Sequence, residues 1–316
     1  MKASAIPKDK FSDPVVTAKG EKRAWVDLTA LKTLWFNTGT LCNLTCANCY
    51  IESSPKNDAL VYLTHEEVCT YLDEIERGNI PTEEIGITGG EPFMNPDILK
   101  IIEECLQRGF KLLVLTNAML PMQRKKNSDP LLKIKDQYGD QMTIRVSVDH
   151  FNKDMHEEER GKQSWAPMIK GLKWLSDNEF TIDIAGRTRW GEKEEKLRDG
   201  FAVLFKEMGI VIDAYNKREL VLFPEMDETA EVQEITTKCW DILGVHPDEM
   251  MCSSSRMVVK RKGAYKPAVL ACTLLAYDSA FELGTTLKEA NKPVPLNHPH
   301  CAKFCVLGGG SCSVTD

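Results

Sequence analysis

Long hydrophobic runs are absent from this 316-residue sequence. Its first residues, MKASAIPKDKFSDPVV, are polar and interrupted by proline, so they do not form the apolar core of a secretory signal peptide. No later apolar stretch approaches the roughly 20 residues that a membrane-spanning helix needs. We therefore expect a cytoplasmic protein that has no membrane partner.

An excess of positive charge is also absent, since the formal net charge is −7. The segment KRKGAYK at 260–266 is the one basic candidate for contact with nucleic acid, and it is better explained as the exposed tip of a β-hairpin. No other stretch interleaves basic with aromatic residues, so nucleic-acid binding and RNA modification are disfavoured. Internal repeats and low-complexity tracts are missing as well. The length suits one large domain followed by a small one.

Cysteine, by contrast, is abundant, with eleven residues in a chain that has no export signal. This combination favours metal binding or redox chemistry over a framework of disulfides. Three cysteines cluster near the N-terminus and five follow residue 250. The remaining three, Cys69, Cys105 and Cys239, are isolated, which is typical of small core residues.

Short apolar runs alternate with amphipathic segments from about residue 33. We expect strands at 33–40, 83–88, 111–116, 142–148, 180–186 and 219–223. Helices are predicted at 64–77, 166–177 and 193–208, and a capping box formed by Thr64 and Glu67 starts the first of them. A further helix is predicted to have Asn95 as its N-cap and Pro96 as its first residue, and to end at Gly109. Because strands that alternate with helices form parallel units, the fold class is α/β, a partial (β/α)6 barrel of the TIM type.

Polar or metal-binding residues follow four of the predicted strands. They are Cys42 to Cys49, Gly89 to Glu91, Thr116 with Asn117, and Asp149 with His150. The chemistry of such barrels takes place at the C-terminal ends of the strands. We therefore expect these residues to converge on one face.

The stretch LCNLTCANCY at 41–50 puts Cys42, Cys46 and Cys49 within eight positions. Structural zinc usually takes four protein ligands, so three thiolates leave one position open. The loop can hold three irons of a [4Fe-4S] cluster and leave the fourth iron free for another ligand. Half of a zinc site is the alternative. The Gly-Gly-Glu-Pro run at 89–92 alone could be an ordinary turn.

Together, CNLTCANCY and the TGGEP run at 88–92 resemble the radical S-adenosylmethionine (SAM) superfamily. The resemblance implies that amino and carboxylate groups of S-adenosylmethionine chelate the open iron. An electron from the cluster then cleaves the cofactor, and the 5′-deoxyadenosyl radical abstracts a hydrogen from the substrate. It also implies an electron donor such as flavodoxin or ferredoxin.

The same resemblance assigns cofactor binding to Tyr50, Gly89, Gly90, Glu91, Thr116, Asn117, Ser147, Asp149 and Arg187. The glycines would let the backbone approach the ligand, and Glu91 would accept its ammonium group. Arg187 would meet the carboxylate. Asn117, Ser147, Asp149 and Arg187 are assigned by strand-end position only, and ordinary loop hydrogen bonding is their alternative. Asn48 stands where many members have an aromatic residue, and Tyr50 follows instead.

The late cysteines resemble the auxiliary-cluster extensions called SPASM and Twitch. They are Cys252, Cys272, Cys301, Cys305 and Cys312, and a β-hairpin with its turn at 261–263 separates the first two. Five thiolates suffice for one cluster with four ligands, which favours the shorter Twitch form and a second [4Fe-4S] cluster. We favour Cys252, Cys272, Cys305 and Cys312 as ligands, with Cys301 as the spare. A structural zinc ribbon is the alternative.

Four segments follow from these assignments. Residues 1–32 are an irregular lead-in, 33–226 the radical SAM barrel, and 227–250 a helical linker with an acidic helix at 227–243. Residues 251–316 form a small cysteine-rich α+β domain of the Twitch or SPASM kind. Its last segment, 298–312, is expected to be loop-like.

For function, we expect an enzyme that oxidises or rearranges a small polar metabolite. The reason is that 41 residues precede Cys42, too few for a fused domain that recognises a leader peptide. The alternative is a maturase that crosslinks, oxidises or epimerises a peptide, and a zinc-binding scaffold is the non-enzymatic one. No residue stands out as the donor or acceptor of hydrogen.

Overall fold

The computed structural model describes residues 10–225 and 231–308. Within them the strands are β1 Trp25–Val26, β2 Thr33–Asn37, β3 Glu84–Thr88, β4 Lys111–Thr116, β5 Met142–Ser147, β6 Thr181–Arg187, β7 Leu220–Phe223, β8 Ser255–Val259, β9 Ala268–Leu270, β10 Glu282–Gly284 and β11 Val294–Pro295. The α-helices are α1 His65–Gly78, α2 Ile98–Gln107, α3 Leu120–Gln123, α4 Lys125–Tyr138, α5 Lys153–Arg160, α6 Trp165–Asp177, α7 Glu194–Met208 and α8 Cys239–Leu243.

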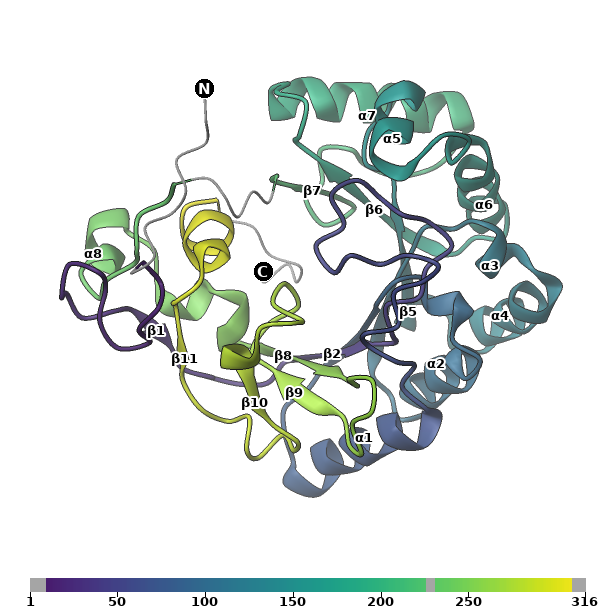
Figure 1. The fold of residues 1–316 in the computed structure, drawn as a ribbon. Helices are drawn as coiled ribbons and strands as arrows, with labels where there is room; N and C mark the ends of the chain where they lie inside the picture. Colours follow the sequence, from purple (N-terminus) through teal and green to yellow (C-terminus); the bar gives the residue numbers. More distant parts are fainter. Residues whose placement is uncertain (1–9, 226–230, 309–316) are drawn as a thin grey trace.

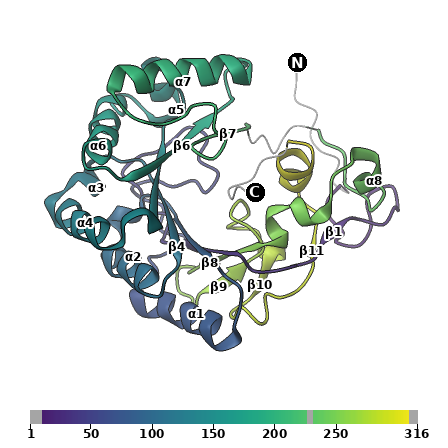
Figure 2. The same cartoon turned by 180° about the vertical axis from the view of Figure 1, so that it is seen from behind.

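One curved sheet organises the molecule. Its strand order is β10-β9-β8-β2-β3-β4-β5-β6-β7, and the strands from β8 to β7 in this order are parallel. Helices α1 to α7 follow the outside of the arc, as Figure 1 and the reverse view in Figure 2 show. This is the open, partial barrel that the alternation of strands and helices predicted.

Strand β2 shows why the sheet is buried on both faces. Leu34 and Phe36 belong to the large core cluster that includes residues of α1, whereas Trp35, between them, packs in a second cluster with Leu113 and Met257. Successive side chains of a strand point to opposite faces, so both faces need apolar residues. The six strands predicted in the barrel are confirmed, as are α6, α7 and the capping box at the start of α1.

The expected start of α2 is wrong. Asp97, not Asn95, is the N-cap residue, and the helix begins at Ile98 rather than at Pro96. The reason is a competing turn, because the Asn95 side chain accepts a hydrogen bond from Asp97 N at 2.9 Å. Its amide also donates to Leu63 O at 2.9 Å, which ties it to the segment before α1.

The acidic helix expected at 227–243 is wrong for residues 231–238, and α8 is the only helical part of that stretch within the described residues. The Glu234 side chain instead accepts hydrogen bonds from Phe11 N and Ala18 N and pairs with the buried guanidinium of Arg23. Thr236 forms a β-bridge with Arg23. These contacts with the N-terminal segment favour an extended chain over a helix.

The last segment also differs from its expected loop. Residues Cys301–Val306 form a π-helical turn, in which Ala302, Phe304 and Val306 are buried. Gly309 to Cys312 lie outside the described residues.

The predicted hairpin is present as β8 and β9, which pair antiparallel. Strand β8 also pairs with β2 in parallel, so the hairpin extends the barrel sheet. Residues 251–316 as a domain of their own remain a proposal. No helix in the described part of the chain has the length and apolar character to cross a membrane.

Candidate active site

The loop after β2 carries the clustered cysteines to a cavity at the C-terminal ends of the parallel strands. Cys42, Cys46 and Cys49 line this cavity, whose empty volume, counted with its open mouth, is about 1080 Å³. The structure brings eight of the nine expected cofactor residues to the same lining: Tyr50, Gly89, Gly90, Thr116, Asn117, Ser147, Asp149 and Arg187.

Gly89 and Gly90 lie against the segment that leads into the cysteine loop. Gly90 N donates to Gly39 O at 2.8 Å, and Glu91 N donates to Leu41 O at 3.1 Å. A Cβ atom on Gly90 would lie 2.3 Å from Leu41 O, and one on Gly89 would lie 2.6 Å from Gly39 O. Glycine is therefore required because two backbones touch, and this contact fixes the cysteine loop against the end of β3.

The ninth residue, Glu91, is not among the cavity-lining residues. It is 1% exposed, and its carboxylate accepts hydrogen bonds from the Thr116 hydroxyl at 2.8 and 3.0 Å, from Asn117 N at 2.9 Å and from Phe93 N at 3.2 Å. Burial raises its pKa to about 7, against the effect of these donors. Glu91 thus joins the ends of β3 and β4, and its contact with a cofactor ammonium stays a prediction.

A buried charge network lies beside the cysteine loop. Asp149 accepts hydrogen bonds from Arg160 and, at 3.2 Å, from Arg187 Nε, while Arg187 Nη2 donates to Asn48 O at 3.2 Å. Burial opposes ionisation of Asp149, but the guanidinium groups of Arg160 and Arg187 outweigh it and hold the pKa of the carboxyl below its usual range. Arg160 also lines the cavity, and nothing in the sequence indicated this role.

Helix α5 holds the cysteine loop through Glu159, another residue that the sequence did not indicate. The Glu159 carboxylate has no exposed surface and accepts from Asn48 N and Asn48 Nδ2, both at 2.9 Å. Its backbone carbonyl accepts from Ala47 N at 2.7 Å. Arg189 pairs with the same carboxylate. Residues 47 and 48, between the second and third cysteines, are therefore fixed by α5.

The thiols of Cys42 and Cys46 lie in surroundings that oppose their ionisation. Burial raises the pKa of Cys42 to about 12 and raises that of Cys46, so ionisation needs a nearby positive charge such as a metal. Leu44 N and Ser53 N point at the sulfurs of Cys42 and Cys49, at 3.4 and 3.3 Å.

The spacing of the three sulfurs favours a cluster over a single zinc ion. Around one tetrahedral zinc, sulfurs lie about 3.8 Å apart. Among the described residues, these three sulfurs do not all lie within 4.8 Å of one another. A multi-iron cluster fits this donor set.

A second cavity of about 440 Å³ of empty space adjoins the first, since Leu274 and Phe304 line both. Four late cysteines line it: Cys252, Cys272, Cys301 and Cys305. The π-helical turn brings Cys301 and Cys305 to the same wall, so Cys301 lies where the sequence assigned a spare. Cys312 lies outside the described residues.

Arg256 supplies a buried positive charge next to Cys252, one of the cysteines that line this second cavity. It is 1% exposed and donates to backbone carbonyls, among them Cys252 O at 2.6 Å and Ala290 O at 3.1 Å. Within the described ranges no carboxylate lies in salt-bridge distance of it. Burial lowers its pKa to about 10, and the thiols of Cys252 and Cys272 act in the opposite direction. Anionic thiolates with a metal centre would supply the missing countercharge.

A family profile described as the radical SAM superfamily matches residues 36–189. The antilisterial bacteriocin subtilosin biosynthesis protein AlbA of Bacillus subtilis (strain 168) is 26% identical over 279 residues, which cover 81% of this chain and 58% of AlbA. Mycofactocin maturase MftC of Mycolicibacterium smegmatis is 27% identical over 73% of this chain and 55% of MftC. The chain thus spans little more than half the length of these relatives.

Among solved structures, SuiB of Streptococcus suis bound to S-adenosylmethionine has the same fold. It matches with a TM-score of 0.57 at 14% identity, covering 81% of this chain and 63% of SuiB. SuiB bound to precursor peptide SuiA matches with a TM-score of 0.55 at 15% identity, covering 80% and 62%. The segment 36–189, which carries the cysteine loop, the glycine pair and the ends of strands β2 to β6, thus belongs to the radical SAM superfamily.

Proposed function

We propose that this chain is a radical SAM enzyme that modifies a peptide. The observation that carries the proposal is the joint lining of one cavity by Cys42, Cys46, Cys49, the Gly89–Gly90 pair and the ends of strands β3 to β7. The three cysteines would hold a [4Fe-4S] cluster and leave one iron for S-adenosylmethionine. When bound, these groups supply one-electron cleavage of the cofactor and a radical able to abstract hydrogen.

The residues of the chain position and shield this chemistry. Arg160 brings a permanent positive charge to the thiols of Cys46 and Cys42, which favours their ionised form. Glu159 fixes the loop between the ligands. Leu115, Phe223 and Phe304 give the cavity apolar lining, which would help to keep water from a reactive intermediate.

A peptide substrate replaces the small polar metabolite that the sequence favoured. The support is that AlbA is named for the biosynthesis of a bacteriocin, MftC is named a maturase, and SuiB has been solved with a precursor peptide. Peptide modification was the alternative weighed from the sequence. A precursor peptide is therefore the partner we propose, together with a one-electron donor of the flavodoxin or ferredoxin kind.

We further propose a second cluster at the adjoining cavity, held by Cys252, Cys272, Cys301 and Cys305. Support comes from their shared cavity and from the buried charge of Arg256. Because Leu274 and Phe304 line both cavities, this cluster would border the substrate side of the first site.

The substrate proposal is tested with anaerobically reconstituted protein, S-adenosylmethionine and a reductant. One arm contains short peptides encoded beside the gene, and another contains a fraction of polar metabolites. We expect a peptide to lose two hydrogens by mass spectrometry, with 5′-deoxyadenosine formed above the peptide-free rate. If only the metabolite fraction raised the rate of 5′-deoxyadenosine formation, the peptide assignment would be wrong and the cluster assignment would still stand.

A further inference from the structure

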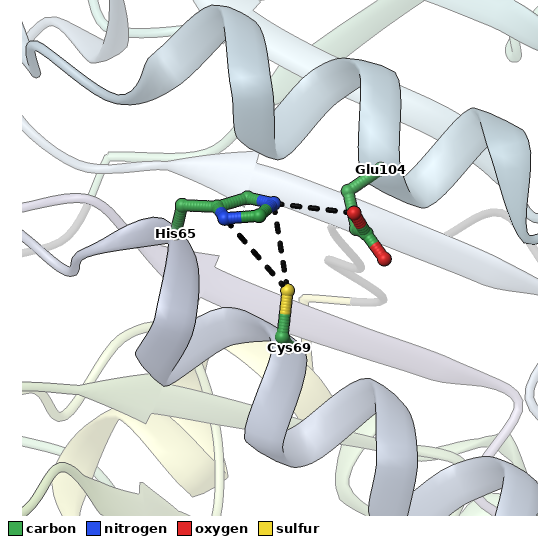
Figure 3. Close-up of side chains that lie close together, drawn as sticks. All are labelled: His65, Cys69 and Glu104. Carbon is green, nitrogen blue, oxygen red and sulfur yellow. Dashed lines mark hydrogen bonds and ion pairs between the residues drawn. The ribbon is translucent and has the colours of Figure 1, made fainter.

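Outside the barrel, three side chains of metal-binding type meet between helices α1 and α2. They are His65, Cys69 and Glu104, and Figure 3 shows the imidazole, thiol and carboxylate pointing toward one another. His65 and Cys69 are four positions apart, so they share one face of α1. Glu104 reaches them from α2. The three ligand atoms lie within 4.8 Å of one another, and no other such group occurs in residues 10–225 and 231–308.

The distances match the edges of a zinc tetrahedron. His65 Nε2 is 3.5 Å from Cys69 Sγ and 3.2 Å from Glu104 Oε2. Metal–ligand bonds of about 2.3 Å to sulfur and about 2.0–2.2 Å to nitrogen and oxygen give edges of about 3.6 and 3.4 Å. The sulfur is also 4.0 Å from Nδ1, so it faces part of the ring. Binding therefore involves a rotation of the imidazole that turns Nε2 toward the shared centre.

The surroundings permit both that rotation and a fourth ligand. The side chains of His65 and Glu104 are 30% and 24% exposed, so water can reach the centre. Arg108 Nε donates to Glu104 Oε1 at 2.8 Å, which leaves Oε2 for a metal. A hydrogen bond to the other oxygen orients a carboxylate ligand. The charge of Arg108 is shared with Asp73 at 2.7 Å and Glu76 at 3.3 Å, which reduces its repulsion of a cation.

We propose that His65, Cys69 and Glu104 form a zinc site that joins α1 to α2, with water as the fourth ligand. Imidazole, thiolate and carboxylate are all ligands of zinc. Binding replaces the proton of the Cys69 thiol with the metal ion, and the proton passes to solvent. The site lies apart from both cysteine-lined cavities, whose linings contain none of these residues. It therefore does not depend on the proposed reaction.

The experiment uses the cluster-loaded protein, to which zinc alone is added before desalting. Zinc K-edge absorption reports only on zinc, so the iron–sulfur clusters do not interfere. We expect one zinc per chain, with one sulfur at about 2.3 Å and nitrogen or oxygen at about 2.0–2.2 Å. A shell of three or four sulfurs would mean that zinc occupies a cluster site, and retention of no zinc would mean a hydrogen-bonded trio only. Either result overturns the proposal.

Matched variants separate the site from other thiols and acids. C69S and E104Q should each weaken zinc binding at least about tenfold in a competition with a fluorescent chelator, since even outer-shell changes cost that much. C239S changes a half-buried cysteine of α8, and E103Q changes the neighbouring glutamate of α2; both should bind zinc within twofold of the wild type. Unchanged iron content shows that a variant is folded. Equal zinc affinity in C69S, E104Q and the wild type would also refute the site.

Discussion

Charged side chains without exposed surface decide how the cysteine loop is held. Glu159 is such a side chain, and it accepts two hydrogen bonds from Asn48 while pairing with Arg189. A buried carboxylate stays ionised only if hydrogen-bond donors surround it, and these donors in turn lose their acceptor if the carboxylate is removed. At the residue scale, the geometry of the proposed cluster site therefore depends on a residue that binds neither cluster nor cofactor.

Glu159→Ala should lower the free energy of unfolding by about 2 kcal/mol, because it leaves partly buried donors of Asn48 and Arg189 without their acceptor. It should also reduce the iron bound after reconstitution. Urea denaturation and iron analysis measure the two effects. The neighbouring Glu158, whose side chain is 54% exposed, gives the matched control Glu158→Ala. Equal iron content in both variants would contradict the conclusion that Glu159 holds the cysteine loop in place.

His156 provides a prediction for pH. It has no exposed surface, neither ring nitrogen has a hydrogen-bond partner, and burial lowers its pKa to about 4. Between pH 4 and about 6.5 the unfolded chain binds a proton that the folded chain does not. Stability therefore falls as the pH drops through this window, by up to about 3 kcal/mol from this group.

His156→Phe should remove that part of the pH dependence and keep the edge contact with Trp165, whose ring centre is 5.3 Å away. Urea midpoints at pH 5 and pH 7 should differ less in the variant than in the wild type. An unchanged difference would show that His156 is not the responsible group.

At the scale of elements, the sequence indicated the strands and helices that apolar packing stabilises and missed those that polar contacts stabilise. All six barrel strands were predictable because their apolar runs are buried on both faces, as Leu34, Trp35 and Phe36 show. Helix α5 was missed because its only buried residues are His156 and Glu159, which give no apolar period. Its available signals were the Asn152 cap, which bonds Asp154 N at 2.9 Å, and the basic last turn.

The same limit explains two wrong expectations. The helix expected across 231–238 has suitable spacing, but Glu234 bonds the N-terminal segment, a contact between distant parts of the chain. Asn95 is not the N-cap because its side chain accepts from Asp97 N in a turn and donates to Leu63 O. For the candidate site, motifs predicted the cysteine loop and strand ends, whereas Arg160 and Glu159 could be found only from the structure.

The contact between the β2 and β3 loops gives a prediction at this scale. Gly90→Ala would place a methyl group 2.3 Å from Leu41 O, a backbone atom that cannot move away alone. We expect a loss of about 2 kcal/mol in stability and a displaced cysteine loop with reduced iron.

The control is Gly78→Ala at the end of α1, where the nearest atom is the flexible Ile80 side chain at 3.1 Å. Thermal unfolding and iron content should separate the two variants. Equal behaviour would mean that the loops separate without cost.

On the scale of the whole molecule, the two cavities share a wall. Leu274 and Phe304 line both, and Phe304 stacks on Phe223 with ring centres 6.2 Å apart. The π-helical turn at Cys301–Val306 therefore contacts β7, the last barrel strand, beside the first cavity. A cluster on one side of this wall would lie next to the substrate on the other.

If Cys252, Cys272, Cys301 and Cys305 hold the second cluster, Cys301→Ser should lower the iron content from about eight to about four per chain. Cys239→Ser should keep about eight, since Cys239 lines neither cavity. Cys312→Ser tests the ligand set favoured from the sequence. A loss of four irons in Cys312→Ser but not in Cys301→Ser would restore that earlier set.

The most direct measurement of the central claim is the formation of 5′-deoxyadenosine under anaerobic conditions with S-adenosylmethionine and a strong reductant. The wild-type protein and the Cys239→Ala control should produce it. A variant with Cys42, Cys46 and Cys49 all changed to Ala should produce none. If cleavage of S-adenosylmethionine persisted in that triple variant, the assignment of the cysteine loop as the cluster site would be wrong.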